Sequence, residues 1–107
     1  MIVMNRNMFE TCITDSEVPV LAAFCSADCG YCRRLQPALK RVSRNWGDSL
    51  LVGQVNIDRE FVLAMEERIE VVPTLVLYHR GKTLGSIVVP DCGDHIDEFL
   101  RETLACG

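Results

Sequence analysis

The stretch "LAAFCSADCGYC", residues 21–32, decides how this chain folds. It begins inside an apolar run over residues 18–26. An unbroken run of this kind predicts a central strand that is buried on both faces. Two cysteines, Cys29 and Cys32, follow the strand directly and lie three residues apart. The residues after them have helical spacing, so the pattern places a pair of thiols between a buried strand and a helix.

The predicted helix covers "CRRLQPALKRVSRNW", residues 32–46. Its apolar residues recur at a spacing that puts them on one face, with Arg and Lys opposite, namely Leu35, Leu39, Val42 and Trp46. Pro37 lies inside this helix and removes one backbone donor, which predicts a kink about a turn beyond the cysteines.

The remaining elements are predicted from the same kinds of pattern. We expect strands at residues 1–4 and 49–58, short helices at 8–14 and 59–69, a hairpin over 73–89 with Gly81 in its turn, and a last helix over 91–105. A capping-box-like pattern, Asp91 to Asp94, opens the last helix. The order β-α-β-α-β-α-β-β-α predicts parallel strands in the first half and an antiparallel final hairpin.

Size and composition limit the classes of function. A chain of 107 residues predicts one domain over residues 1–107, and 49% hydrophobic residues supply a packed core. The net charge of −4 disfavours binding to nucleic acid or to an anionic membrane. No segment approaches the roughly 18 apolar residues of a membrane span, and the N-terminus lacks a signal-peptide pattern. We therefore expect a cytoplasmic protein, and we expect a monomer.

Three of the six cysteines, Cys25, Cys29 and Cys32, form the pattern C-x3-C-x2-C. The same spacing is found in radical-SAM enzymes, where three thiolates hold an iron–sulfur cluster. Such enzymes need a large partial barrel, which a chain of 107 residues cannot supply. Cys25 also belongs to the end of a buried strand, where it is expected as a small core residue. A simpler zinc or cluster site on these three thiols remains an alternative.

A dithiol is the other interpretation, and its chemistry accounts for the spacing. Cys29 is expected near the N-cap of the helix, where free backbone N–H groups and the helix dipole favour a thiolate. Gly30 would let the backbone turn tightly and would leave room for an incoming substrate. Cys32 lies deeper and would resolve the mixed disulfide. Asp28 opposes thiolate formation and Arg33 favours it, so the sign of the pKa shift stays open.

Over nearly its whole length the sequence resembles the thioredoxin family. The matching segments are residues 21–32, Pro37, "VNID" at 55–58, "VVPTLVLYHRG" at 71–81 and the final "IDEFLRETL". The resemblance implies the thioredoxin fold, an α/β architecture with a mixed central sheet of about five strands and helices on both faces. It also implies that Pro73 is cis and packs beside the dithiol, and that the backbone of Val72 pairs with an extended substrate.

The activity implied by the resemblance is thiol–disulfide exchange, with Cys29 and Cys32 as the catalytic pair that reduces protein disulfides. We expect Gly30, Tyr31, Val72 and Pro73 to contact the substrate. No cofactor and no metal are expected, and the electron donor would be an enzyme of the thioredoxin-reductase type.

Three positions depart from the family pattern. Ala23 stands where the family has a buried acid, Gln54 where it has the lysine partner of that acid, and Cys25 where it commonly has a tryptophan. Because the resemblance implies that this acid deprotonates the resolving cysteine, its absence predicts slower turnover than is usual in the family. The alternative function is a thioredoxin-like binding or specialised redox module with weak reductase activity.

Overall fold

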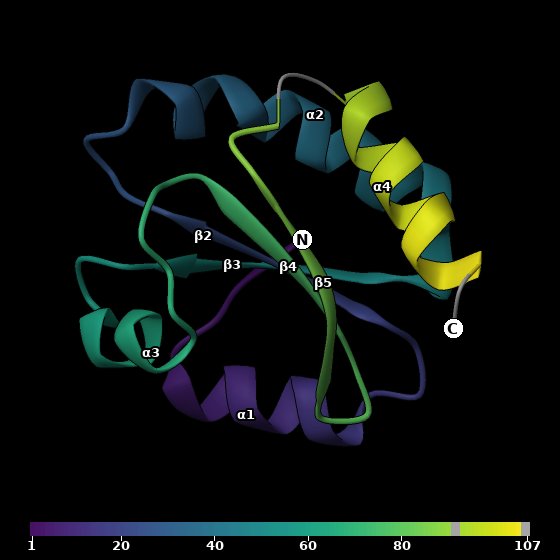
Figure 1. The fold of residues 1–107 in the computed structure, drawn as a ribbon, viewed down its shortest axis with the longest axis horizontal. Coiled ribbons are helices and arrows are strands. Elements are labelled where there is room, and N and C mark those ends of the chain that lie inside the picture. Colours follow the sequence, from purple (N-terminus) through teal and green to yellow (C-terminus); the bar gives the residue numbers. More distant parts are fainter. Residues whose placement is uncertain (91–92, 106–107) are drawn as a thin grey trace.

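The computed structural model describes residues 1–90 and 93–105. The elements follow the predicted order, as Figure 1 shows: β1 (Ile2–Val3), α1 (Arg6–Asp15), β2 (Val20–Cys25), α2 (Gly30–Trp46), a short 3-10 turn (Gly47–Ser49), β3 (Leu51–Asn56), α3 (Phe61–Glu66), β4 (Thr74–His79), β5 (Lys82–Val88) and α4 (Gly93–Ala105). Most strands and the short helix α3 are a few residues shorter than the sequence predicts. Asp91, the predicted start of the last capping box, lies outside the described residues.

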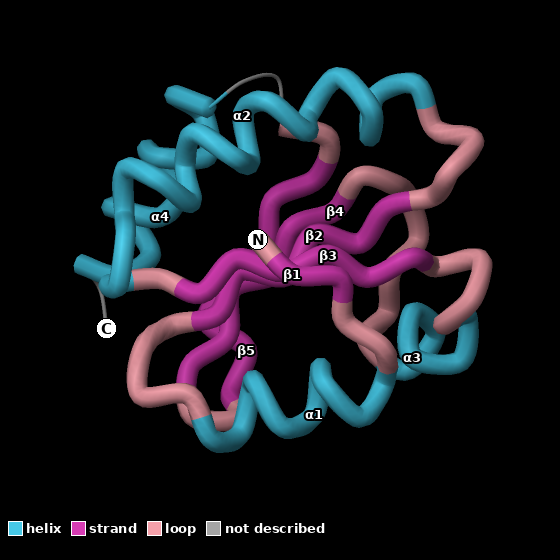
Figure 2. The backbone as a smooth tube through the Cα atoms, turned by 180° about the vertical axis from the view of Figure 1, so that it is seen from behind, coloured by secondary structure: helices cyan, strands magenta, loops and turns pink. Residues whose placement is uncertain are grey.

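The sheet has five strands in the order β1-β3-β2-β4-β5. β1 and β2 both run parallel to β3, whereas β4 runs antiparallel to β2 and to β5. The predicted mixed sheet and the antiparallel hairpin are therefore confirmed. Helices α2 and α4 cover one face, and α1 and α3 cover the other (Figures 1 and 2). β2 lies in the middle and is buried at all six positions, which explains its unbroken apolar sequence.

Alternation along β2 divides its side chains between two hydrophobic cores. Leu21, Ala23 and Cys25 join the core beneath α2 and α4, together with Cys32. The residues between them join the core on the α1 side, where Phe9 packs edge-on against Phe24 and Tyr78. The same alternation that builds both cores therefore brings Cys25 to the face of the sheet where the dithiol helix lies.

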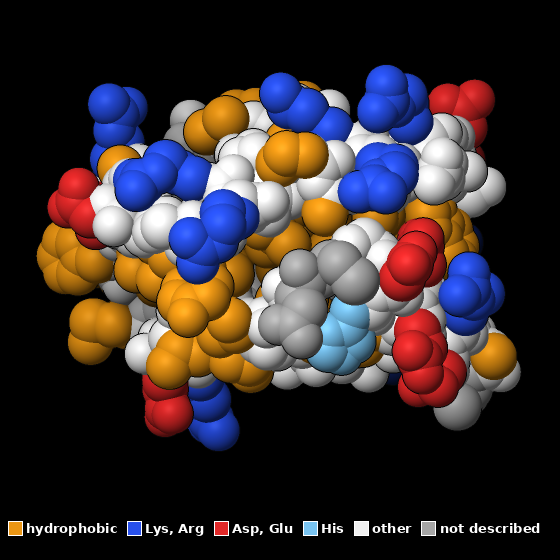
Figure 3. Space-filling view, turned by 90° about the horizontal axis from the view of Figure 1, so that it is seen from above, with side chains coloured by type: hydrophobic (Ala, Val, Ile, Leu, Met, Phe, Trp, Pro, Cys, Tyr) orange, Lys and Arg blue, Asp and Glu red, His pale blue; other side chains and the backbone are white. Residues whose placement is uncertain are grey.

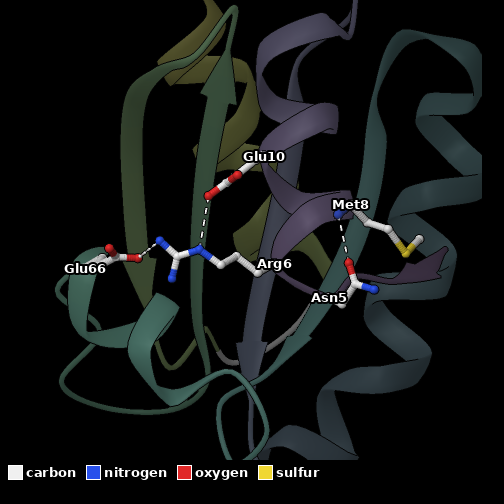
Figure 4. A network of polar contacts seen from close by, with 5 residues as sticks. All are labelled: Asn5, Arg6, Met8, Glu10 and Glu66. Atoms are coloured by element: carbon white, nitrogen blue, oxygen red, sulfur yellow. Dashed lines mark hydrogen bonds and ion pairs between the residues drawn. The ribbon is translucent and has the colours of Figure 1, made fainter.

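Helix α1 starts two residues earlier than predicted because polar side chains organise its first turn. The Asn5 side chain accepts a hydrogen bond from the backbone N–H of Met8 at 2.9 Å, which is an N-cap. Arg6 pairs with Glu10 at 3.2 Å and with Glu66 at 2.6 Å (Figure 4). Because Glu66 ends α3, the second pair links the two helices that cover this face of the sheet.

The hairpin turns through Arg80 and Gly81, whose φ angles are 53° and 80°. Two consecutive left-handed residues form the tight turn that matches the twist of a hairpin, and Gly81 occupies the predicted turn position. The backbone N–H of Gly81 donates to the carbonyl of Ile13 at 2.6 Å. This bond fastens the hairpin tip to the C-terminal end of α1.

Helix α2 continues through Pro37 over 17 residues, and the kink stays a prediction. The indole Nε1 of Trp46 donates to Asp97 of α4 at 2.9 Å, so the two helices are tied at that end.

Helix α2 also carries five of the chain's eleven Lys and Arg residues and none of its fifteen Asp and Glu residues. Figure 3 looks down on the side of the molecule that carries α2 and α4, where Lys and Arg side chains are spread across the surface. Among the described residues, every helix is too short or too polar to cross a bilayer.

Candidate dithiol site

Cys29 is the N-cap residue of α2, with an extended backbone (φ −89°, ψ 113°). Its side chain is half-buried, and its Sγ accepts a hydrogen bond from the backbone N–H of Cys32 at 3.1 Å. The same sulfur lies 3.9 Å from the carbonyl oxygen of Val72, to which the protonated thiol donates. The first cysteine is therefore held at the helix start, partly open to solvent, as predicted.

The environment of Cys29 favours the thiolate. Partial burial acts to raise the pKa of the thiol, but the hydrogen bonds from the side chain and backbone of Cys32 and from the backbone of Tyr31 act against it. The charge of Arg33 acts in the same direction as those bonds, and the net pKa of Cys29 lies below its ordinary value. The structure thus gives the sign that the sequence left open.

Cys32 lies one turn inside α2 and is only 2% exposed. Burial raises the pKa of its thiol, and its hydrogen bond to the Cys29 sulfur raises the pKa further, while hydrogen bonds from the Ser26 backbone and from Cys25 lower it only in part. One thiol of the pair is therefore accessible and readily ionised, and the other is buried and protonated. This is the division expected of an attacking and a resolving cysteine.

The segment before β4 closes the other side of the site. The Val72–Pro73 peptide bond is cis, which confirms the prediction, and Pro73 is buried. The hydroxyl of Thr74 donates to the carbonyl of Val71 at 2.6 Å, and the N–H of Val89 donates to the carbonyl of Pro73 at 2.8 Å. These bonds hold the Val72 carbonyl against the Cys29 sulfur.

Exposed side chains surround the dithiol. Tyr31 is 61% exposed and Val71 is 47% exposed, and the guanidinium of Arg34 lies 4.6 Å from the centre of the Tyr31 ring.

Gly30 does not form the tight turn expected from the sequence, because it is an ordinary helical residue whose φ is not positive. A Cβ added there would meet nothing nearer than the Arg34 side chain at 3.8 Å, so no tight turn requires glycine. Its contact with substrate stays a prediction.

The departures from the family pattern lie together beneath Cys32. Ala23 is fully buried and pairs with Gln54 across β2 and β3. The side-chain amide of Gln54 donates to Gln36 of α2 at 2.6 Å. The site therefore has alanine at the position of the family's buried acid, and at the position of the lysine it has a glutamine that pairs with a second neutral amide. Sequence spacing could not reveal Gln36, because it meets Gln54 only through the packing of α2 on the sheet.

A cavity of about 240 Å³ opens beside this pair. It is lined by both buried thiols and by polar side chains, among them Cys25, Cys32, Gln36, Gln54 and Asn56. Next to it, Asp58 accepts hydrogen bonds from the Ser26 hydroxyl at 2.9 Å and from the Ala27 N–H at 3.4 Å, which holds the loop before Cys29. No sequence pattern predicts this cavity, because its walls come from four elements.

The alternative of a metal or cluster site gains no support from the geometry. Within residues 1–90 and 93–105, no group of three His, Cys, Asp or Glu side chains is arranged to hold a metal ion. Cys25 is buried at the end of β2, as predicted for a core residue, and Cys12, Cys25, Cys29 and Cys32 are free thiols. Cys92 and Cys106 lie outside the described residues.

Comparison with known proteins agrees with this geometry. The thioredoxin family model matches residues 1–102. The chain is 29% identical to a probable thioredoxin-2 of Caenorhabditis elegans over 87% of this chain and 64% of that protein. It is 28% identical to the mitochondrial thioredoxin of Bos taurus over 90% of this chain and 58% of that protein. A thioredoxin of Acidithiobacillus ferridurans is 33% identical over 74% of this chain and 73% of its own length.

The chain thus spans less than two thirds of the first two of these relatives. The family match, by contrast, runs from the first strand into the last helix and includes the dithiol, the cis proline and the whole sheet. On this basis the chain belongs to the thioredoxin family.

Proposed function

We propose that this protein is a thiol–disulfide oxidoreductase that reduces protein disulfides through Cys29 and Cys32. One observation carries the proposal: a half-exposed thiol with a lowered pKa caps α2, and a buried partner thiol lies one turn inside the same helix. Thiol–disulfide exchange requires this asymmetry, because one sulfur must attack as thiolate and the other must wait until the mixed disulfide has formed.

In the first step the Cys29 thiolate attacks one sulfur of a substrate disulfide. A Cys29–substrate bond forms, the substrate S–S bond breaks, and the released substrate thiolate takes a proton from solvent. In the second step Cys32 loses its proton and attacks the Cys29 sulfur, which frees the second substrate thiolate. The substrate has gained two electrons, and the protein holds a Cys29–Cys32 disulfide until a donor of the thioredoxin-reductase type reduces it.

The substrate would lie along Val72. This residue precedes β4, so its backbone is not part of the sheet ladder, and its carbonyl marks the edge of the site next to Cys29. An extended segment can add there as a short strand, with Tyr31 and Pro73 on either side of the reacting sulfur. Neither a bound cofactor nor a metal takes part in this chemistry, and C-x-x-C thiols used in this way fit a cytoplasmic setting.

The neutral environment of Ala23 and Gln54 favours a slower enzyme than a typical family member. The second step needs a proton acceptor near Cys32, and the adjacent side chains are the amides of Gln36 and Gln54. A specialised redox or binding module with weak reductase activity is therefore the second candidate.

Reduction of insulin by dithiothreitol is the experiment that separates the two. We expect the protein to accelerate insulin precipitation, Cys29→Ser to abolish the acceleration, and Cys12→Ser, on the far face of the sheet, to preserve it. A rate equal to that of dithiothreitol alone would reject the reductase and favour the binding module.

A further inference from the structure

Three thiols, Cys25, Cys29 and Cys32, lie close together at this site. The backbone N–H of Cys32 donates to the Cys29 sulfur at 3.1 Å, and Cys25 and Cys32 line the same cavity. The thiols of Cys25 and Cys32 also influence one another's pKa. Cys25 and Cys32 also belong to the same buried core, and Cys29 packs at its margin. The resolving sulfur therefore has two thiol neighbours and could form a disulfide with either.

The sulfurs of Cys25 and Cys32 are not locked in close packing. Both residues line the cavity of about 240 Å³, which Ala27, Gln36 and Gln54 also border, and Cys29 is not among its lining residues. The cavity gives these two side chains room to rotate towards each other, and it gives solvent a route to both sulfurs. Close-packed interiors seldom leave such space beside a reactive group.

We propose that Cys25 is a third redox-active thiol, which exchanges with the Cys29–Cys32 disulfide so that the oxidised protein holds a Cys25–Cys32 disulfide and a free Cys29. This inference rests on the proposed function, because substrate turnover supplies the initial Cys29–Cys32 disulfide.

The exchange conserves electrons. Cys25 loses its proton to solvent through the cavity and attacks the sulfur of Cys32. A Cys25–Cys32 bond forms, the Cys29–Cys32 bond breaks, and Cys29 leaves as a thiolate. No outside oxidant or reductant takes part, because the protein holds one disulfide and one thiol before and after the step.

The environments of the two competing thiols drive the exchange forward. Burial raises the pKa of Cys25, whereas the backbone N–H groups of Tyr31 and Cys32 and the charge of Arg33 act to lower the pKa of Cys29, and these influences remain when Cys32 is in a disulfide. A disulfide equilibrium favours the arrangement that leaves the most stable thiolate free. Buried Cys25 is therefore the better partner for Cys32, and Cys29 is the better thiolate. The attack is slow, since little of Cys25 is ionised at neutral pH.

The exchanged state has a different use from the reduced protein. Its free Cys29 can still attack a substrate disulfide, but Cys32 is occupied and cannot resolve the mixed disulfide. A second thiol of the substrate must displace Cys29 instead, which moves a disulfide within the substrate without net oxidation or reduction. The class of activity that follows is disulfide isomerisation by the oxidised form.

The sequence makes the two disulfides separable by mass spectrometry. Wild-type protein would be oxidised with one equivalent of a small dithiol-specific oxidant, and free thiols would be trapped with a maleimide at mildly acidic pH, where exchange is slow. Cleavage before Asp15, Asp28 and Asp48 puts Cys25 on one peptide and both Cys29 and Cys32 on another. We expect a cross-linked pair of peptides with the maleimide on Cys29, and loss of this labelled Cys29 in Cys25→Ser. Oxidised wild type with only the disulfide inside residues 28–47 would overturn the proposal.

A second variant tests whether the two buried sulfurs meet. In Cys29→Ser, the same oxidant should link Cys25 to Cys32, and the absence of this link would also overturn the proposal. Insulin reduction by the wild type separates this inference from the proposed function. Active protein without the cross-linked peptides rejects only the third thiol, whereas inactive protein that forms the link rejects only the reductase.

Discussion

The backbone N–H of Cys32 points at the sulfur of Cys29, with 3.1 Å between nitrogen and Sγ. In the first turn of α2 the Cys32 side chain is buried, while the backbone N–H of the same residue faces the Cys29 sulfur. Because this amide is one of the unpaired donors at a helix N-terminus, its bond to sulfur uses a group that would otherwise face solvent. The nucleophile is activated mainly by its position at the start of α2, and the predictions below vary the groups around that position.

Arg33 should tune the ionisation of Cys29. Its guanidinium is fixed by a 3.0 Å hydrogen bond to the carbonyl of Ala27, and its charge lowers the pKa of Cys29. The rate of alkylation by iodoacetamide rises with pH as the thiol ionises, with a midpoint below that of an ordinary cysteine. Arg33→Gln should move the midpoint to higher pH and slow labelling at neutral pH by about two- to fivefold, the size of a solvent-screened charge effect.

Arg34→Gln is the matched control for this experiment. Arg34 carries the same charge one residue further on, but its guanidinium lies over the Tyr31 ring, and the cation that lowers the pKa of Cys29 is Arg33. We expect its labelling profile to overlap that of the wild type. Equal shifts in both variants would show that net charge, and not the placement of Arg33, sets the pKa of Cys29.

A carboxylate placed beneath Cys32 should accelerate the second step of disulfide reduction. Ala23 is fully buried opposite Gln54, so Ala23→Asp puts an acid in the core near the resolving thiol. A well-placed general base is worth on the order of 100-fold in rate. The buried carboxylate should lower the free energy of unfolding by a few kcal/mol. Gln54→Lys in addition should recover part of that loss, because the two charges can pair.

Stopped-flow reduction of a protein disulfide would measure the resolving rate, with Ala23→Asn as the uncharged control of similar shape. The gain should appear in Ala23→Asp, or in the double variant, and not in Ala23→Asn. Equal resolving rates in all four proteins would mean that another group already accepts the Cys32 proton, with Tyr31 and Asp58 the next to test.

Val89 has a positive φ of 46°, a conformation that costs a β-branched residue roughly 1–2 kcal/mol. Its N–H holds the carbonyl of Pro73, so the strained residue supports the site directly. Val89→Gly should raise the free energy of unfolding in urea by up to about 1 kcal/mol, after the greater chain entropy of glycine is subtracted. Val88→Gly, in the extended strand next to it, should lower the same quantity by about 1 kcal/mol. A loss of stability in both variants would argue against strain at Val89.

Phe9 should contribute strongly to stability, because it is buried in the core on the α1 side of the sheet. It is 1% exposed and packs edge-on against Phe24 and Tyr78 at centroid distances of 6.0 and 5.3 Å. Phe9→Ala should lower the free energy of unfolding by about 3–5 kcal/mol through the cavity it leaves. Phe61→Ala, at a side chain that is 61% exposed, should change it by less than about 0.5 kcal/mol. Comparable losses in the two variants would contradict the burial of Phe9.

Local sequence signals predicted most of the fold. The apolar run of β2, the spacing of α2 and the Arg80–Gly81 turn each depend on neighbouring residues, and all were placed correctly to within a few positions. The cis bond before Pro73 followed from the family resemblance and is also present. What sequence could not supply depends on side chains brought together from distant segments. The contact of Gln54 with Gln36 and the cavity beside Cys25 are of this kind, and so is the pair that Arg6 makes with Glu66.

The positive charge of α2 affects how the protein meets a charged partner in solution. This one helix carries five cationic side chains and no anionic ones, in a chain whose net charge is −4. Helix α4, on the same face of the sheet, carries four acidic side chains and one arginine, so the positive charge is confined to α2 and does not extend over the whole face. An acidic protein would be attracted to α2 itself, and because Cys29 caps that helix, such encounters would begin close to the reactive sulfur. Such steering is strongest at low ionic strength and fades as salt is added.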